Sequence, residues 1–149
     1  IAAGGIADGR GIAAAFMLGA EAVQMGTRFV ATEECNVHEN YKQFLLKARD
    51  IDTRVTGRTT GHPVRTLRNP MTKEYLEKEA AGASFEELEM LTLGGLRKAV
   101  VDGDVKTGSV MSGQIAGMVK DVPTCKDLMA RLIRETKEAV KKNSFLVEE

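Results

Sequence analysis

Residues 1–11 read IAAGGIADGRG, and a little later residues 21–30 read EAVQMGTRFV. The first stretch opens with a fully apolar run, typical of a buried strand in a parallel sheet, and this run ends on Gly4-Gly5. The second stretch has the pattern of another short strand, which ends on Gly26-Thr27. The sequence between them has the pattern of a helix. Strand, loop, helix and strand in this order predict one βαβ unit of a parallel sheet.

The helix between the two strands has recognisable start and stop residues. Asp8 is a candidate N-cap, and Gly19 is a natural C-cap after the apolar run. Because both strands point the same way, Gly4-Gly5 and Gly26-Thr27 are expected at one edge of the sheet. Glycines there leave backbone N–H groups accessible, and the helix N-terminus adds positive potential. We therefore expect an anion site, built like the phosphate site after strands seven and eight of a TIM barrel.

A simpler interpretation is that these glycines only form tight turns. For either pair alone this alternative stays open, but two pairs one βα unit apart favour the anion site. The glycine spacing differs from the Rossmann fingerprint, and no Lys-Ser/Thr pair completes a P-loop.

Beyond residue 30 the pattern is mostly helical. We expect a helix over 36–50 with Asn36 as its N-cap, and an extended segment or short hairpin over 53–69. A two-piece helix broken near Gly82 follows, and then a short helix, a loop over 109–119 and a long amphipathic helix. The apolar face of this last helix carries Leu128, Met129, Leu132, Ile133, Ala139 and Val140, and its start carries Thr124 and Asp127.

Composition narrows the function classes. The chain has 149 residues, enough for one compact domain, and its 21 basic and 21 acidic residues balance. This balance argues against nucleic-acid or membrane-surface partners, since both favour a basic excess. The two cysteines, Cys35 and Cys125, are expected to be reduced thiols, and no residues have metal-ligand spacing. The apolar start lacks the basic region of a signal peptide.

The histidines allow two interpretations each. His38 lies near the start of the predicted helix over 36–50 and is expected to be a surface or capping residue. His62 shares its segment with Arg58, Arg65 and Arg68, so this segment is either a basic loop that meets an anionic substrate or cofactor phosphate, or a solvated hairpin.

Three segments carry a family resemblance: AAGGIADGRGIAAAFMLGAEAVQMGTRFVATEE, KARDIDTRVTGRTTGHPVRTLRN and AVVDGDVKTGSVMSGQIAGMV. They resemble the C-terminal half of the FMN-dependent enoyl-acyl carrier protein reductases II, within the nitronate monooxygenase (2-nitropropane dioxygenase) family. The first segment resembles the family as a whole. GHPVRTLRN and GDVKTGSVMSGQIAG are more similar to the reductase branch than to the monooxygenase branch.

The resemblance implies an α/β fold: the C-terminal part of a TIM (β/α)8 barrel with a small, mostly helical domain after strand eight. Residues 1–33 would be the end of the FMN-binding barrel, 34–108 a small cap domain, and 109–149 a loop returning to the flavin and the closing helices. By the same resemblance, the expected flavin-binding residues are Ala3, Gly4, Gly5, Gln24, Gly26, Thr27, Ser112, Gly113 and Gln114.

The implied parent protein is a cytoplasmic enzyme of fatty acid biosynthesis, with FMN and NAD(P)H as cofactors and an acyl carrier protein thioester as substrate. It would form a homodimer or remain a monomer. The family's catalytic histidine is expected upstream of residue 1, so neither histidine here is assigned to catalysis. A nitronate monooxygenase that uses FMN and oxygen is the first alternative. The second is an inactive half-barrel fragment with phosphate-binding loops, which we expect to be poorly stable alone because its sheet edges are open.

Overall fold

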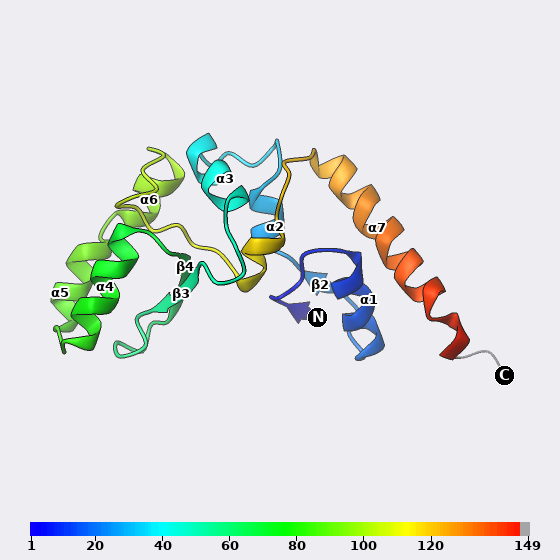
Figure 1. Ribbon diagram of the computed structural model, residues 1–149, viewed down its shortest axis with the longest axis horizontal. Helices are drawn as coiled ribbons and strands as arrows, with labels where there is room; N and C mark the ends of the chain where they lie inside the picture. Colours follow the sequence, from blue (N-terminus) through cyan, green and yellow to red (C-terminus); the bar gives the residue numbers. More distant parts are fainter. Residues whose placement is uncertain (147–149) are drawn as a thin grey trace. The chain divides into compact units, whose positions relative to one another are not determined.

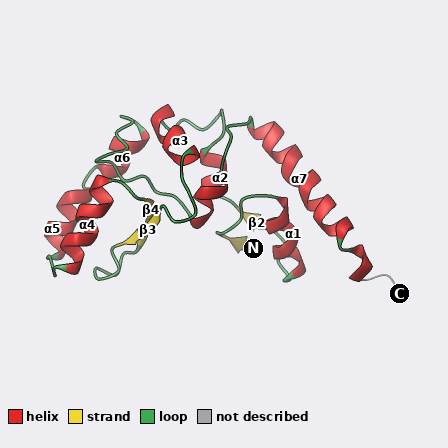
Figure 2. Cartoon of the chain, in the orientation of Figure 1, coloured by secondary structure: helices red, strands yellow, loops and turns green. Residues whose placement is uncertain are grey.

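The computed structural model describes residues 1–146 and divides the chain into two compact units. Unit 1 consists of Ile1–Cys35 together with the chain from Asp121 onward, and unit 2 is Asn36–Lys120. The chain contains two pairs of short strands, β1 with β2 and β3 with β4, and the other elements are helices (Figures 1 and 2). The fold is therefore mixed α/β, as the sequence predicts.

Unit 1 contains the βαβ unit that the first thirty residues predict. Strand β1 (Ala2–Ala3) pairs in parallel with β2 (Val23–Gln24), and α1 (Gly9–Met17) connects them. Asp8 is the N-cap of α1, as expected, and its carboxylate accepts from the backbone N–H groups of Arg10 and Gly11. Gly19, with φ +92°, turns the chain after the last residue of this helix.

The second strand is shorter than predicted. Instead of continuing to Gly26-Thr27, it ends at Gln24, and α2 (Thr27–Val30) begins directly after Gly26. The Gly26 carbonyl accepts from the N–H groups of Phe29 and Val30, at 2.9 and 3.2 Å. Gly26 has helical backbone angles (φ −98°, ψ −72°), so the local hydrogen bonds of a helical turn replace further strand pairing.

Helix α7 (Cys125–Lys142) packs on α1 and begins at Thr124, as predicted. Gly9 permits the close approach, since a Cβ at this position would lie 2.4 Å from the Thr136 backbone nitrogen. The contact encloses a small core of Ile6, Ile12, Ala15, Leu128 and Leu132. Of the predicted apolar face of α7, Leu128 and Leu132 are buried, whereas Met129, Ile133 and Val140 are largely exposed. The 3-10 turn η2 (Ser144–Leu146) follows α7.

Unit 2 is built around an antiparallel hairpin, as expected. Strands β3 (Thr53–Thr56) and β4 (Val64–Leu67) pair with Thr53 opposite Leu67 and Thr56 opposite Val64. The helices of this unit are α3 (Glu39–Leu46), α4 (Pro70–Ala80), α5 (Phe85–Thr92), α6 (Gly95–Val100) and the 3-10 helix η1 (Gln114–Met118). The predicted break near Gly82 is confirmed between α4 and α5.

The start of α3 differs from the prediction. His38, rather than Asn36, is the N-cap, and its Nδ1 accepts from the backbone N–H of Asn40 at 3.1 Å. The imidazole packs against Gly103, where a Cβ would lie 2.3 Å from Nδ1. The His38 backbone N–H also donates to the Val100 carbonyl at 2.8 Å. These longer-range contacts select His38 over a residue with stronger intrinsic capping propensity.

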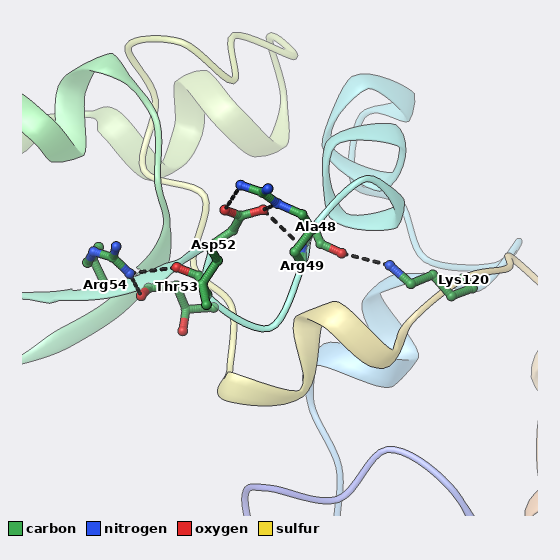
Figure 3. A network of polar contacts seen from close by, with 7 residues as sticks. Ala48, Arg49, Asp52, Thr53, Arg54 and Lys120 are labelled. Carbon is green, nitrogen blue, oxygen red and sulfur yellow. Dashed lines mark hydrogen bonds and ion pairs between the residues drawn. The ribbon is translucent and has the colours of Figure 1, made fainter.

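Polar contacts hold the turn that leads from α3 into β3 (Figure 3). The Asp52 carboxylate accepts from the backbone N–H of Arg49 at 3.0 Å and pairs with its guanidinium at 3.1 Å. Lys120 Nζ donates to the Ala48 carbonyl at 2.7 Å. Asn69 closes the hairpin by capping α4, with its side chain accepting from the Thr72 N–H.

Residues 109–120 belong to unit 2, and long-range backbone hydrogen bonds connect residues 110 and 111 to its hairpin. The Leu67 N–H donates to the Val110 carbonyl at 2.8 Å, and Met111 forms an isolated bridge with Thr66. Residues 109–111 therefore lie beside β4 in unit 2 without forming a further strand. Helix α7, in contrast, belongs to unit 1.

Candidate functional site

The glycines after β1 and β2 form an open backbone edge in unit 1. Parallel pairing places Ala3 opposite Gln24, so the residues that follow both strands emerge side by side. Gly4 and Gly5 have φ values of +83° and +73°, which favour glycine. A Cβ at Gly4, Gly5 or Gly26 would meet no atom of the described chain within 4 Å. The space beside these glycines is therefore open to a ligand.

The surrounding predicted residues share this edge. Ala3 and Gln24 are exposed at the ends of their strands, and Thr27 is the first residue of α2. The Phe29 and Val30 N–H groups of α2 already donate to the Gly26 carbonyl. Unit 1 thus brings together the predicted residues Ala3, Gly4, Gly5, Gln24, Gly26 and Thr27.

The prediction that the N-terminus of α1 contributes positive potential to the anion site is wrong. The Gly9 N–H donates to Glu135 Oε2 of α7 at 3.0 Å, and the Arg10 and Gly11 N–H groups donate to Asp8. Burial opposes ionisation of Asp8, yet the side chain of Arg10 and these N–H groups hold the pKa of Asp8 below its usual value. Two carboxylates therefore occupy the positive end of α1, and the open edge depends on the glycines.

The predicted residues Ser112, Gly113 and Gln114 lie in unit 2, where Ser112 and Gly113 directly precede η1 and Gln114 is its first residue. The Ser112 N–H donates to the Arg65 carbonyl at 3.0 Å, which fixes the backbone. Among the described residues, the Ser112 hydroxyl is buried without a hydrogen-bond partner. A buried hydroxyl left in this state costs free energy, so its position suits a polar ligand atom.

His62 and the arginines of the hairpin lie at different places along it. His62 is exposed, and its ring lies 6.2 Å from that of Phe85. Arg65 pairs with Val55 in the hairpin, and its guanidinium donates to Thr53 Oγ1 at 3.0 Å. Arg58 and Arg68 are exposed at opposite ends of the hairpin. Of these residues only Arg65 lies on a strand, whereas Arg58 and His62 lie in the turn between β3 and β4, and Arg68 follows β4.

Unit 2 also contains a pocket that the sequence analysis did not identify. It has a volume of about 420 Å³ and lies between the hairpin and helices α4, α5 and α6. His62, Tyr75, Ser109 and Met111 are among its lining residues. The only sequence signal for it was the Thr-rich hairpin followed by an amphipathic helix pair, which is too general to predict a cavity.

Two classes of site find no support in residues 1–146. In this part of the chain no three His, Cys, Asp or Glu side chains come together in a way that could hold a metal ion. Over the same residues, no helix is both long enough and apolar enough to cross a membrane.

Comparison with known proteins resolves the family. The model of the nitronate monooxygenase family matches residues 1–135. The chain belongs to the nitronate monooxygenase family. A nitronate monooxygenase of Paraburkholderia phytofirmans is 36% identical over 94% of this chain and 38% of its own length. A Mycobacterium tuberculosis protein named as an indene-carboxyl-CoA dehydrogenase is 31% identical over 99% of this chain and 52% of its own length.

Solved structures agree with this membership. FabK from Thermotoga maritima is 50% identical, with a TM-score of 0.87, over 94% of this chain and 44% of that chain. A nitroalkane oxidase from Streptomyces ansochromogenes is 31% identical, with a TM-score of 0.74, over 94% of this chain and 40% of the other. The resemblance found in the sequence is thus confirmed at the level of the family. The chain spans about half, or less, of the length of these relatives.

Proposed function

We propose that this chain is the phosphate-binding and cap portion of an FMN-dependent oxidoreductase, with unit 1 as the end of a TIM barrel. The observation that carries the proposal is the open edge formed by Gly4, Gly5 and Gly26 after two parallel strands. Backbone N–H groups at such an edge suit the flavin phosphate, because a phosphate accepts several hydrogen bonds at once.

Each unit, taken by itself, contains residues whose chemistry fits part of the cofactor. In unit 1, Ala3–Gly5 and Gln24–Thr27 would hold the phosphate through backbone and side-chain donors. The family resemblance also assigns Ser112 of unit 2 to the flavin, and its hydroxyl, buried with no partner among the described residues, suits a polar ligand atom. When bound, FMN supplies hydride transfer between NAD(P)H and the substrate, and the protein binds, orients and shields it.

For the reaction, we propose reduction of the double bond of an enoyl thioester on acyl carrier protein, in the cytoplasm. The support is the similarity of residues 61–69 and 103–117 to the reductase branch. These two segments are adjacent in unit 2, where the Leu67 N–H donates to the Val110 carbonyl and Thr66 bridges Met111. Oxidation of nitronates by oxygen is the second candidate, favoured by the names of several relatives.

Titration of the chain with FMN and with riboflavin tests the phosphate edge. FMN is expected to bind at least about tenfold more tightly than riboflavin, because charge-assisted hydrogen bonds are worth ~1.5–3 kcal/mol. Gly26→Ala should weaken FMN binding about tenfold and leave riboflavin binding unchanged. Its φ of −98° suits alanine and its Cβ would enter open space, so the melting temperature should not change.

Two positive-φ glycines give a matched pair of controls. Gly5→Ala and Gly82→Ala introduce similar strain, at φ +73° and +80°, and neither Cβ meets a described atom within 4 Å. Only Gly5→Ala should weaken FMN binding. Equal affinity for FMN and riboflavin in the unaltered chain would remove the basis of the proposal.

Assays of the full parent enzyme separate the two reactions. The reductase consumes NADH or NADPH with a crotonyl thioester, and it shows no nitronate-driven oxygen uptake. Oxygen uptake with a nitronate and no need for a reduced nicotinamide would instead assign the chain to the monooxygenase branch.

A further inference from the structure

The pocket of unit 2 has a mainly apolar wall. It is enclosed by the β3–β4 hairpin, by α4, α5 and α6, and by the segment 109–111. Its volume of about 420 Å³ lies within the range of small-molecule sites. The apolar side chains that line it are Val64, Met71, Phe85, Leu88, Leu96 and Met111.

The threonine hydroxyls along the hairpin side of this pocket already have partners within the protein. Thr56 Oγ1 donates to the Val64 carbonyl at 3.3 Å, and Thr60 Oγ1 donates to the Gly57 carbonyl at 3.1 Å. Thr66 Oγ1 lies 3.2 Å from Thr72 Oγ1. These groups therefore need no polar atom from a ligand, and the pocket suits a ligand segment without hydrogen-bonding groups.

The charged side chains around the pocket disfavour an anionic ligand. Among the described residues that line it, none is lysine or arginine, whereas the carboxylate of Glu89 is present. A phosphate would meet the like charge of Glu89 here and no lysine or arginine side chain. This lining disfavours the phosphates of a nicotinamide nucleotide or of phosphopantetheine, and it favours an uncharged apolar chain.

We propose that this pocket receives the acyl chain of the thioester substrate. The inference rests on the proposed function, which supplies a substrate with such a chain. Continuity of the backbone supports it: Met111 lines the pocket, and the next residue, Ser112, begins the loop proposed to meet the flavin. The chain length that the enzyme accepts is then set by the side chains of unit 2.

The test measures how the affinity of the protein for an enoyl thioester depends on the length of its acyl chain. The full chain is titrated calorimetrically with enoyl-pantetheine thioesters of four, eight and twelve carbons. Affinity should rise about threefold to fourfold per added CH₂ until the pocket is filled, the factor that corresponds to ~0.8 kcal/mol per buried CH₂. An affinity independent of acyl length would overturn the inference.

A matched pair of variants locates the effect. Val64→Phe fills the pocket, whereas Val55→Phe places the same ring on a residue of the same hairpin that does not line it. Both valines are half-buried, so both changes test the tolerance of the hairpin alike. Val64→Phe should weaken binding of the twelve-carbon thioester at least about tenfold and spare the four-carbon thioester, and Val55→Phe should change neither.

Two further measurements keep the test decisive. If Val64→Phe does not fold, Leu96→Ala replaces it: Leu96 is 46% exposed, and its loss should weaken long-chain binding severalfold without unfolding. FMN affinity is measured in parallel. Normal FMN binding without acyl-length dependence overturns the inference alone, whereas length dependence without FMN binding overturns the proposed function and leaves the apolar pocket established.

Discussion

The two units of this chain bury their apolar side chains to different extents. Among the largest fully buried side chains, Leu45, Leu67, Leu88, Val110 and Val119 belong to unit 2, and Leu128 belongs to unit 1. Both units also leave large apolar side chains exposed: Leu93 of unit 2 is 65% exposed, and Phe16, Met129 and Ile133 of unit 1 are between 41% and 51% exposed beside a groove of about 450 Å³. A residue's contribution to stability should therefore depend on whether it lies in the buried core of unit 2 or on the exposed groove of unit 1.

The largest effect is expected in the core of unit 2. Leu88 is 1% exposed on α5 and contacts Met71 and Tyr75, so Leu88→Ala should lower the free energy of unfolding by about 2–5 kcal/mol. Urea denaturation measures this change. Leu93→Ala, just after the same helix and 65% exposed, is the control and should cost far less. Similar losses in both variants would contradict a closed core.

A smaller effect is expected at the polar junction of unit 2. Asn69 accepts from the Thr72 N–H and donates to the Val105 and Gly108 carbonyls, at 2.9 and 2.8 Å. Asn69→Asp keeps the helix cap but places a carboxylate against two carbonyl oxygens. We expect a loss of about 2–3 kcal/mol in thermal or urea unfolding. An unchanged stability would mean that these hydrogen bonds contribute nothing net.

In unit 1 the corresponding polar junction is more exposed and should matter less. Asp121 pairs with Arg131 at 2.7 Å and with the buried Arg28 at 2.9 Å. The Arg131 hydrogen bond, against the effect of burial, holds the pKa of Asp121 below its usual value. Because the Asp121 side chain is 48% exposed, solvent screens the pair, and Asp121→Asn should cost only about 1 kcal/mol near neutral pH.

The same contact predicts a pH dependence with a definite sign. A carboxyl group whose pKa is lower in the folded state stabilises the fold at pH values above its unfolded pKa. This contribution decreases as the pH falls below about 4, through the folded pKa. Unfolding curves at several pH values should therefore show the unaltered chain and Asp121→Asn converging in acid, and parallel curves would contradict the assigned contact.

The smallest effect on stability is expected on the exposed groove of unit 1. Ile133 is 51% exposed on α7, so Ile133→Ser should change the free energy of unfolding by no more than about 0.5 kcal/mol. If this groove is a contact between copies of the chain, the substitution should also reduce self-association, because it removes apolar surface from the groove. Sedimentation velocity over a concentration series measures this, and an unchanged association would show that the groove is not a contact surface.

Local sequence signals predicted much of the secondary structure. Asp8 and Thr124 cap the helices that they were expected to cap, and Gly82 separates α4 from α5. These signals succeed because capping and turn formation depend on residues only a few positions apart. They failed at Asn36, where packing of His38 against Gly103 moves the start of the helix.

By itself, the sequence determined the family, the βαβ order and the position of the glycines at the strand ends. Only the tertiary structure decided that Glu135 of α7 caps the Gly9 N–H and thereby removes the α1 N-terminus from the anion site. It also decided that the Ser112 hydroxyl is buried and that Val64, but not Val55, lines the unit 2 pocket. The physical reason is range: the sequence encodes local hydrogen bonds directly, whereas the side chains that meet across long separations depend on how the elements pack.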